Sequence, residues 1–110
     1  MARKDWRVDD CRGLRVGTLE RVYASSSGAP AWFLVRLGRY STRFVLTPAA
    51  EVLAWQGRVS LPWERTRIER APLLYAPPAE VTADMEDELR RHYRLVEVSD
   101  VHLTVRRTVA

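Results

Sequence analysis

The residues that could act as a base, a nucleophile or a metal ligand are few and widely spaced. The chain has one cysteine, Cys11, and two histidines, His92 and His102. A serine hydrolase needs a nucleophile, a histidine base and an orienting acid, and neither histidine lies in a recognisable motif of that kind. His92 falls on an expected helix beside its apolar positions, and His102 alternates with apolar residues of an expected tail strand. Packing and solvent exposure therefore explain both histidines, and the sequence predicts no catalytic site.

Metal, carboxylate and phosphate-loop chemistry are not supported either. A zinc site made from Cys11, His92 and a carboxylate would match no known spacing of ligands. The neighbouring Asp9 and Asp10 would point to opposite faces of a strand, so a turn before Gly13 explains them better than paired acid–base chemistry. The glycines before residue 20 are isolated and precede no helix, unlike those of a phosphate-binding loop. We expect a protein that is not an enzyme and holds no metal or cofactor.

Size and composition predict one soluble domain. A chain of 110 residues is long enough for a single compact unit and too short for two. Hydrophobic residues make up 46% and charged residues 29%, which are ordinary globular proportions. The single cysteine cannot form an internal disulfide and fits a reducing cytoplasm. Because no signal segment and no apolar stretch of membrane-spanning length is present, we expect a cytoplasmic protein without membrane insertion.

The positive charge raises the question of nucleic-acid binding. The formal net charge is +4, but a modest excess of this kind is common in soluble domains. Aromatic residues interleaved with arginine can stack bases, and the best such cluster is the candidate partner-binding surface Arg36, Arg39, Tyr40 and Arg43. Four tryptophans could also stack bases: Trp6, Trp32, Trp55 and Trp63. At least two are expected to be structural, because Trp63 shares the inward phase of Val59 and Leu61 and Trp32 lies between apolar neighbours. Nucleic acid is therefore a possible partner, and a protein partner is favoured.

Turn residues and a two-residue alternation of apolar side chains predict short strands in the first part of the chain. They are expected over residues 5–11, 14–24, 31–38, 43–47, 51–55 and 58–63. Gln56 and Gly57 predict a tight hairpin turn, and Gly17, at a change of phase, predicts a bulge or bend. Short strands with bend glycines are typical of a barrel, because closing the sheet removes its exposed edges. We expect a mainly β fold, a small six-stranded barrel with one C-terminal helix.

The second part of the chain predicts that helix and a strand-like extension. Thr82 can cap a helix over residues 82–93, whose apolar residues recur every four positions. This apolar stripe should lie on the barrel or on a second subunit. Residues 96–110 are expected to join the edge of the barrel or to pair with another chain. The candidate dimer interface combines positions of the helix and the tail: Met85, Leu89, Tyr93, Val101, Leu103 and Val105.

An ordered series of short segments resembles the PRC-barrel family. The segments are Trp6–Tyr23, Pro30–Gly38, Arg43–Leu46, Val59–Trp63, Ile68–Pro72 and His92–Tyr93, and they extend over about residues 5–95. Arg94 departs from the pattern, because a glycine often follows the His–Tyr pair. The resemblance implies a small β-barrel that acts as a bacterial protein-interaction module, as in stress-response and photosynthetic reaction-centre H-subunit-like proteins. It implies no catalytic residues.

The sequence thus predicts a non-catalytic, PRC-barrel-like interaction module that forms a homodimer. Residues 1–95 would form the domain, and residues 96–110 its extension. The alternative is an RNA- or ribosome-associated factor that uses the arginine and aromatic surface, since the family also supplies a domain of a ribosome maturation factor. The two alternatives differ in whether Arg39 and Arg43 contact phosphates.

Overall fold

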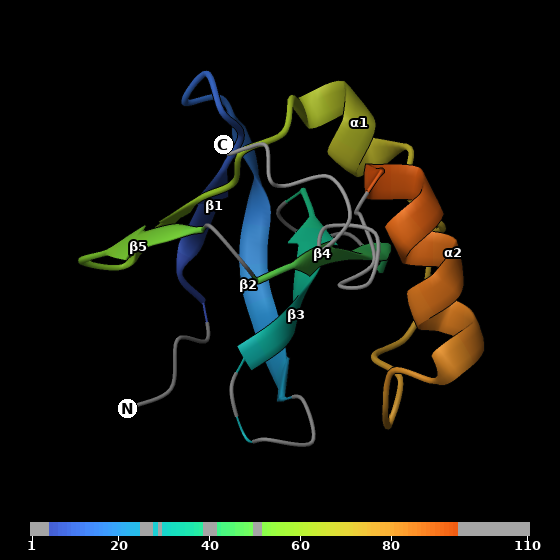
Figure 1. Ribbon diagram of the computed structural model, residues 1–110. Helices are drawn as coiled ribbons and strands as arrows, with labels where there is room; N and C mark the ends of the chain where they lie inside the picture. The colour runs from blue at the N-terminus through green and yellow to red at the C-terminus, as the bar shows by residue number, and fades with distance from the viewer. Residues whose placement is uncertain (1–4, 25–27, 29, 39–41, 50–51, 95–110) are drawn as a thin grey trace, which may run out of the picture.

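The computed structural model describes residues 5–24, 28, 30–38, 42–49 and 52–94. Six strands and two helices follow one another along the chain (Figure 1): β1 (Arg7–Asp9), β2 (Arg15–Ala24), β3 (Pro30–Leu37), β4 (Phe44–Pro48), β5 (Leu53–Trp55), β6 (Arg58–Ser60), α1 (Arg65–Glu69) and α2 (Ala83–Tyr93). The expected extension over residues 96–110 lies outside the described residues. No helix in the described ranges is both long enough and apolar enough to cross a bilayer.

The six strands form one open, mixed sheet. Their order is β4-β3-β2-β1-β6-β5, so the first strand of the chain lies in the middle. All neighbouring strands are antiparallel except β1 and β6, which are parallel. The outer strands β4 and β5 do not pair with each other, and the sheet is not closed. The predicted mainly β class is therefore confirmed, but the predicted barrel is wrong.

The outer edge of β4 is satisfied by other segments of the chain, so it needs no further strand. Phe44 donates its N–H to the carbonyl of Leu74 at 2.7 Å, and Leu74 donates to the carbonyl of Phe44 at 2.8 Å. The Tyr93 hydroxyl donates to the carbonyl of Leu46 at 2.9 Å. These contacts satisfy backbone groups that a barrel would present to another strand. The segment after α1 and the end of α2 thus cover an edge that we expected a strand to cover.

The six strands predicted before the helix are all present, and β1 and β6 are shorter than expected. Gln56 and Gly57 connect β5 to β6 with φ angles of 46° and 82°, the pattern of a tight hairpin turn that matches the twist of its strands. The bulge expected near Gly17 is also present. Val8 and Asp9 are consecutive in β1, but their partners in β2 are Gly17 and Arg15, so β2 has one extra residue between them. Turn chemistry and phase changes were therefore reliable guides to local structure.

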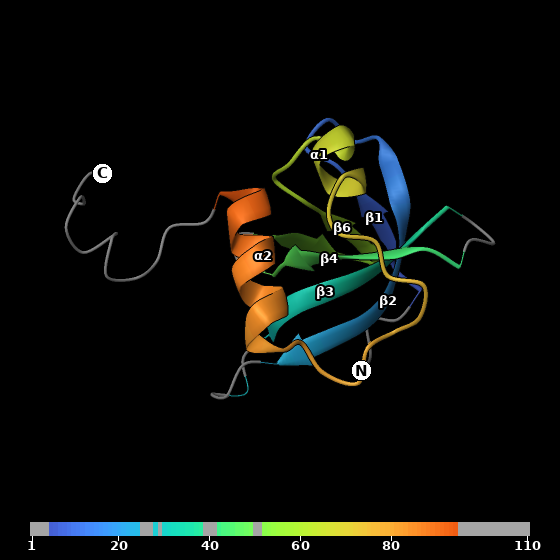
Figure 2. The same cartoon turned by 90° about the vertical axis from the view of Figure 1, so that its right-hand side faces the viewer.

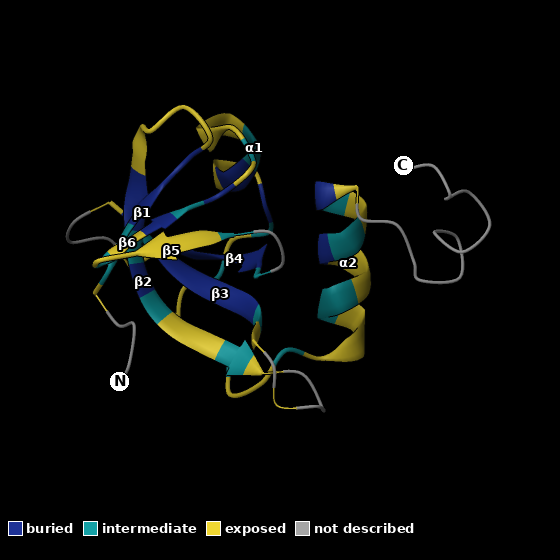
Figure 3. Ribbon diagram, turned by 60° about the vertical axis from the view of Figure 1, so that its left-hand side comes forward, coloured by how far each residue is buried: buried dark blue, intermediate teal, exposed yellow. Residues whose placement is uncertain are grey.

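The core is built around β3. Residues 32–35 of this strand are all buried, so both faces of β3 are covered. Ile68 from α1 and Leu89 and Tyr93 from α2 belong to the same core. Figure 2 shows α2 beside the sheet near β3 and β4, and Figure 3 shows its buried residues on the side toward the sheet. The two helices thus complete the core of an open sheet.

The two helices differ in how far the sequence predicts them. Helix α2 has the expected cap, since the Thr82 hydroxyl accepts a hydrogen bond from the Met85 N–H at 3.2 Å. It ends at Arg94, which adopts the left-handed conformation with φ 57° that usually favours glycine at this position. Helix α1 was not expected, because it has only five residues and its N-cap residue, Glu64, makes no side-chain cap.

Candidate functional site

The helix positions of the predicted dimer interface pack on the sheet of their own chain. Leu89 is 3% exposed and Tyr93 2%, and Met85 packs partly buried against the same core. The Tyr93 ring lies 4.8 Å from that of Trp63 between centroids, and burial raises the pKa of its hydroxyl. A second copy could reach Leu89 and Tyr93 only if α2 left the sheet. The tail positions Val101, Leu103 and Val105 lie outside the described residues.

The predicted arginine and aromatic surface is only partly described. Arg39 and Tyr40 lie outside the described residues, and Arg43 is exposed just before β4. Arg36 donates from Nη2 to Oε1 of Glu20 at 2.6 Å, and its guanidinium lies 5.7 Å from the centroid of the Phe44 ring. The charge of Arg36 is therefore paired within the fold.

The strand β5 exposes two large apolar side chains at the open edge of the sheet. Leu53 is 74% exposed and Trp55 71%, more than any other large hydrophobic residue that the structure describes. The β5–β6 hairpin projects away from α2, and Figure 3 shows β5 as exposed along its length. Leu53 and Trp55 share one face of the strand, where they line a hollow of about 640 Å³ together with Arg58 and Ser60 of β6.

The orientation of the β6 backbone follows from its bonds to β1. Arg7 donates its N–H to the carbonyl of Gly57 at 2.9 Å, and Leu61 donates to the carbonyl of Asp9 at 2.9 Å. In a strand the backbone groups of successive residues point to opposite sides. The odd-numbered residues of 57–61 therefore turn their backbone groups toward β1, and the even-numbered residues turn theirs toward β5.

The backbone of β5 consequently has one residue directed outward. Arg58 and Ser60 face β5, where their register partners are Trp55 and Leu53. Ala54, between those partners, turns its N–H and C=O away from β6, toward the side on which no further strand lies in the part of the chain that the structure describes. An unpaired edge flanked by exposed apolar side chains is a template for pairing with another strand. We define Leu53, Ala54 and Trp55 as the open edge.

The pattern of residues along the chain does not indicate the open edge. It predicts Trp55 only as one of four possible stacking residues and Leu53 only as a strand residue. The signal that could have found them is the absence of such protection: residues 52–57 include no charged residue and no proline, whereas edge strands usually carry one or the other. Which strand becomes an edge depends on the sheet order, and the order does not follow from alternation.

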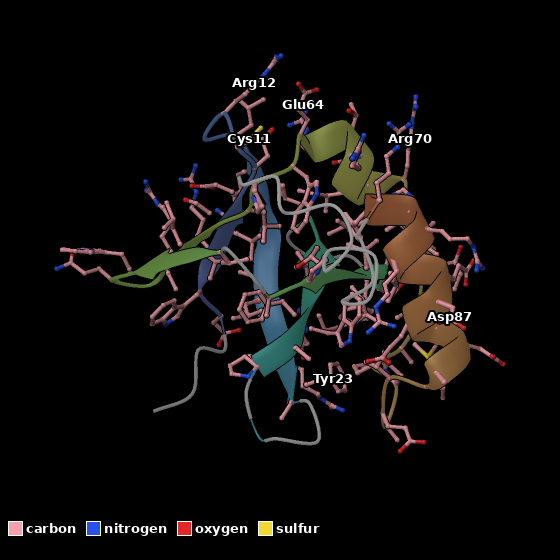
Figure 4. The ribbon with its side chains drawn as sticks, viewed as in Figure 1. Cys11, Arg12, Tyr23, Glu64, Arg70 and Asp87 are labelled. Atoms are coloured by element: carbon pink, nitrogen blue, oxygen red, sulfur yellow. The ribbon has the colours of Figure 1, made fainter. Side chains whose placement is uncertain are left out.

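A second hollow, of about 700 Å³, lies at the end of the molecule where α1 meets the last turn of α2. Its polar lining comes from distant parts of the chain: Cys11, Glu64, Arg67, Arg70, His92 and Arg94. Figure 4 shows Cys11, Glu64 and Arg70 at this end of the molecule, around α1. We call this hollow the arginine hollow.

The arginine hollow brings together a cysteine, a histidine and a carboxylate, the residue types of the zinc site for which the sequence shows no known ligand spacing. Cys11, His92 and the carboxylate-bearing Glu64 all line it. Within the described part of the chain, however, no three His, Cys, Asp or Glu residues form a group that could hold a metal ion. His92 Nε2 lies 2.6 Å from the carbonyl oxygen of Arg67. A carbonyl only accepts, so Nε2 carries a proton and donates it, which ties α2 to α1.

Asp10, next to the hollow residue Cys11, acts as a turn residue, as the sequence indicated. Its Oδ1 accepts hydrogen bonds from the N–H groups of Arg12 and Leu14, both at 2.8 Å, and its Oδ2 accepts from the N–H of Arg65 at 3.0 Å. Burial alone would raise the pKa of Asp10, but these three bonds and the charge of Arg12 outweigh it and lower the pKa below 3.8. Asp10 therefore caps the first N–H of α1 from the turn after β1.

Comparisons with known proteins add no relative. No family model matches the chain, and no curated protein is significantly similar to it. The resemblance to the PRC-barrel family stays a prediction, and the function must be argued from the surfaces described above.

Proposed function

We propose that the chain is a non-catalytic protein-interaction module that pairs with a second copy of itself along the open edge. The observation that carries this proposal is an outer strand whose two large apolar side chains are exposed and whose outward backbone groups face no other strand among the described residues. The other outer strand, β4, is covered by Leu74 and Tyr93. Since proteins usually cover or charge such edges, one uncovered and uncharged edge suggests an interface.

The open edge is complementary to itself in an antiparallel arrangement. If Ala54 pairs with Ala54 of the second copy, Leu53 lies opposite Trp55 of that copy, and the reverse holds by symmetry. The two outward-directed Ala54 backbones would exchange two hydrogen bonds across the two-fold axis. Aromatic–aliphatic cross-strand pairs stabilise a sheet, and the small Ala54 leaves room at the axis. Because the open edge carries no charge, this pairing brings no like charges together.

The size of the open edge sets the strength of this association. Stable interfaces bury about 1,200–2,000 Å² in total, and a strand of three residues covers far less. We therefore expect a weak, reversible dimer that forms at high protein concentration. Each chain has a formal net charge of +4, so the two copies repel each other and added salt should strengthen the dimer.

A register-specific disulfide tests the proposed pairing. In the variant C11S/A54C, the two introduced thiols meet at the axis, where a hydrogen-bonded pair has a Cα–Cα distance of about 5.5 Å, within the range of disulfides. In the matched control C11S/L53C, the two Cα atoms lie about 8 Å apart in the same pairing, which is too far. We expect the first variant to form covalent dimers at least about tenfold faster than the control under mild oxidation.

Three outcomes would contradict the proposal. Equal rates of cross-linking in both variants would show random collisions, and sedimentation that gives a monomer at every concentration would exclude the dimer. The variant W55K should abolish concentration-dependent association, because it places a charge on the open edge without touching the core. A far-ultraviolet spectrum and thermal unfolding of W55K identify a loss of folding, and a folded W55K that still dimerises would also overturn the proposal.

A further inference from the structure

The arginines around the arginine hollow differ from most others that the structure describes. Of the ten arginines described outside the hollow, six are paired with carboxylates, as Arg36 is with Glu20 at 2.6 Å. Arg67, Arg70 and Arg94 all line the hollow, and none of them makes an ion pair with any residue in the described ranges. Three guanidinium groups without counter-ions around one concave surface create a positive potential that a hollow focuses.

The one carboxylate in the lining does not neutralise these arginines. Glu64 accepts through Oε2 a hydrogen bond from Nη2 of Arg12 at 3.2 Å, so its charge is engaged at the rim. Figure 4 shows Arg12 and Glu64 near each other, with Arg70 on the other side of α1. The formal charge of the lining is therefore dominated by the three arginines.

The fold fixes where two of these arginines lie. Arg67 and Arg70 are three residues apart on α1 and its C-cap, so they emerge from neighbouring positions of one helical turn. Asp10 accepts a hydrogen bond from the N–H of Arg65, the first residue of α1. His92 donates a hydrogen bond to the carbonyl of Arg67 in the same helix. The backbone under the arginines is thus anchored before any ligand arrives, which lowers the entropy that binding must overcome.

We propose that the arginine hollow binds the phosphate group of a ligand. Guanidinium groups donate in a planar fork that matches phosphate oxygens, and a phosphate has enough acceptor oxygens to engage more than one arginine at once. A carboxylate offers two oxygens and one negative charge, whereas a phosphate monoester offers three oxygens and up to two negative charges and so balances more of the charge of three arginines. This proposal does not depend on the pairing of the open edge, because the two surfaces share no residue.

Phosphate groups reach a protein as small phosphorylated molecules or as the backbone of a nucleic acid, and two probes distinguish these sources. The first probe is pyrophosphate and the second a short single-stranded RNA, both titrated calorimetrically into the full chain at low salt. The test variant is R67Q/R70Q. The matched control is R15Q/R91Q, which removes the same charge from two exposed arginines that lie outside the hollow and make no ion pair with the described residues.

We expect R67Q/R70Q to raise the Kd for the bound probe at least about tenfold, and R15Q/R91Q to change it less than about twofold. Binding of pyrophosphate supports a small phosphorylated ligand, and binding of the RNA alone supports a nucleic-acid backbone. Failure of the wild-type chain to bind either probe overturns the proposal. An equal loss of affinity in the control variant also overturns it, because that result would show an effect of net charge alone.

Discussion

The substitution Gly17→Ala should lower the free energy of unfolding by about 3 kcal/mol, the largest effect that we expect from one added carbon atom. Gly17 lies in β2, where a Cβ atom would overlap the backbone carbonyl oxygen of Arg36 on β3. A backbone oxygen within a paired strand cannot rotate away as a side chain can. The sheet must therefore separate locally between β2 and β3, which are paired across Gly17 and Leu37.

The control for this prediction is Gly13→Ala. Gly13 has a φ of 84°, so alanine there bears the cost of a left-handed backbone, about 1–2 kcal/mol, but it meets no atom within contact distance. The free energies of unfolding of both variants, measured in urea, compare the cost of steric overlap at residue 17 with the cost of backbone strain at residue 13. If Gly17→Ala is no more destabilising than Gly13→Ala, β2 and β3 do not approach each other as closely as described.

The substitution Asp10→Ala should also lower the free energy of unfolding by about 3 kcal/mol. It removes a buried, ionised acceptor that satisfies the N–H groups of Arg12, Leu14 and Arg65. Water can replace part of this loss, because the three donor residues are exposed. The variant should therefore loosen the turn after β1 and the start of α1 together, and hydrogen exchange at those three amides should increase.

The effect of Asp10 should depend on pH in a defined direction. Its pKa in the folded chain is below the ordinary value of 3.8, so folding favours the ionised form. The stability that Asp10 contributes is fully present above its unfolded pKa and is lost as the pH falls through its lower folded pKa. Urea unfolding between neutral and strongly acidic pH should show this loss in the wild-type chain and a smaller loss in Asp10→Asn.

An exposed aspartate provides the comparison for the pH experiment. Asp84 lies in the first turn of α2 and is exposed, so Asp84→Asn should cost only a few tenths of a kcal/mol and should leave the steepness of the acid transition nearly unchanged. If Asp84→Asn flattens the transition as much as Asp10→Asn does, the hydrogen bonds of Asp10 are not its source.

Local features of the fold followed from the sequence, and the closure of the sheet did not. Alternation, the Gln56-Gly57 turn and the Thr82 cap depend on neighbouring residues, and each has its expected place. Closure of the sheet depends on whether its two outer strands, β4 and β5, pair with each other. That outcome was decided by Leu74 and Tyr93, which bond to β4 from segments that no two-residue alternation describes. Such contacts between distant segments leave no periodic signal.

The candidate surfaces were predictable to different degrees. The stripe Met85, Leu89 and Tyr93 was recognised as apolar from its spacing, but spacing does not tell whether such a stripe meets its own sheet or another chain. The arginine hollow could not be predicted, because α1 is short and its capping acceptor, Asp10, is more than fifty residues away. Residues that a fold brings together across such a separation are recognised only when the fold is known.

The central position of β1 constrains the order in which the sheet can assemble. The strands β2, β3 and β4 are consecutive antiparallel neighbours, so they need only short loops to meet. The β5–β6 hairpin joins the rest of the sheet only through the parallel pairing of β1 with β6. The chain between these two paired strands contains β2, β3, β4 and β5. Closing that long loop costs the most chain entropy. During synthesis, β1 can therefore pair with β2 early, but it can pair with β6 only after the ribosome has synthesised most of the described chain.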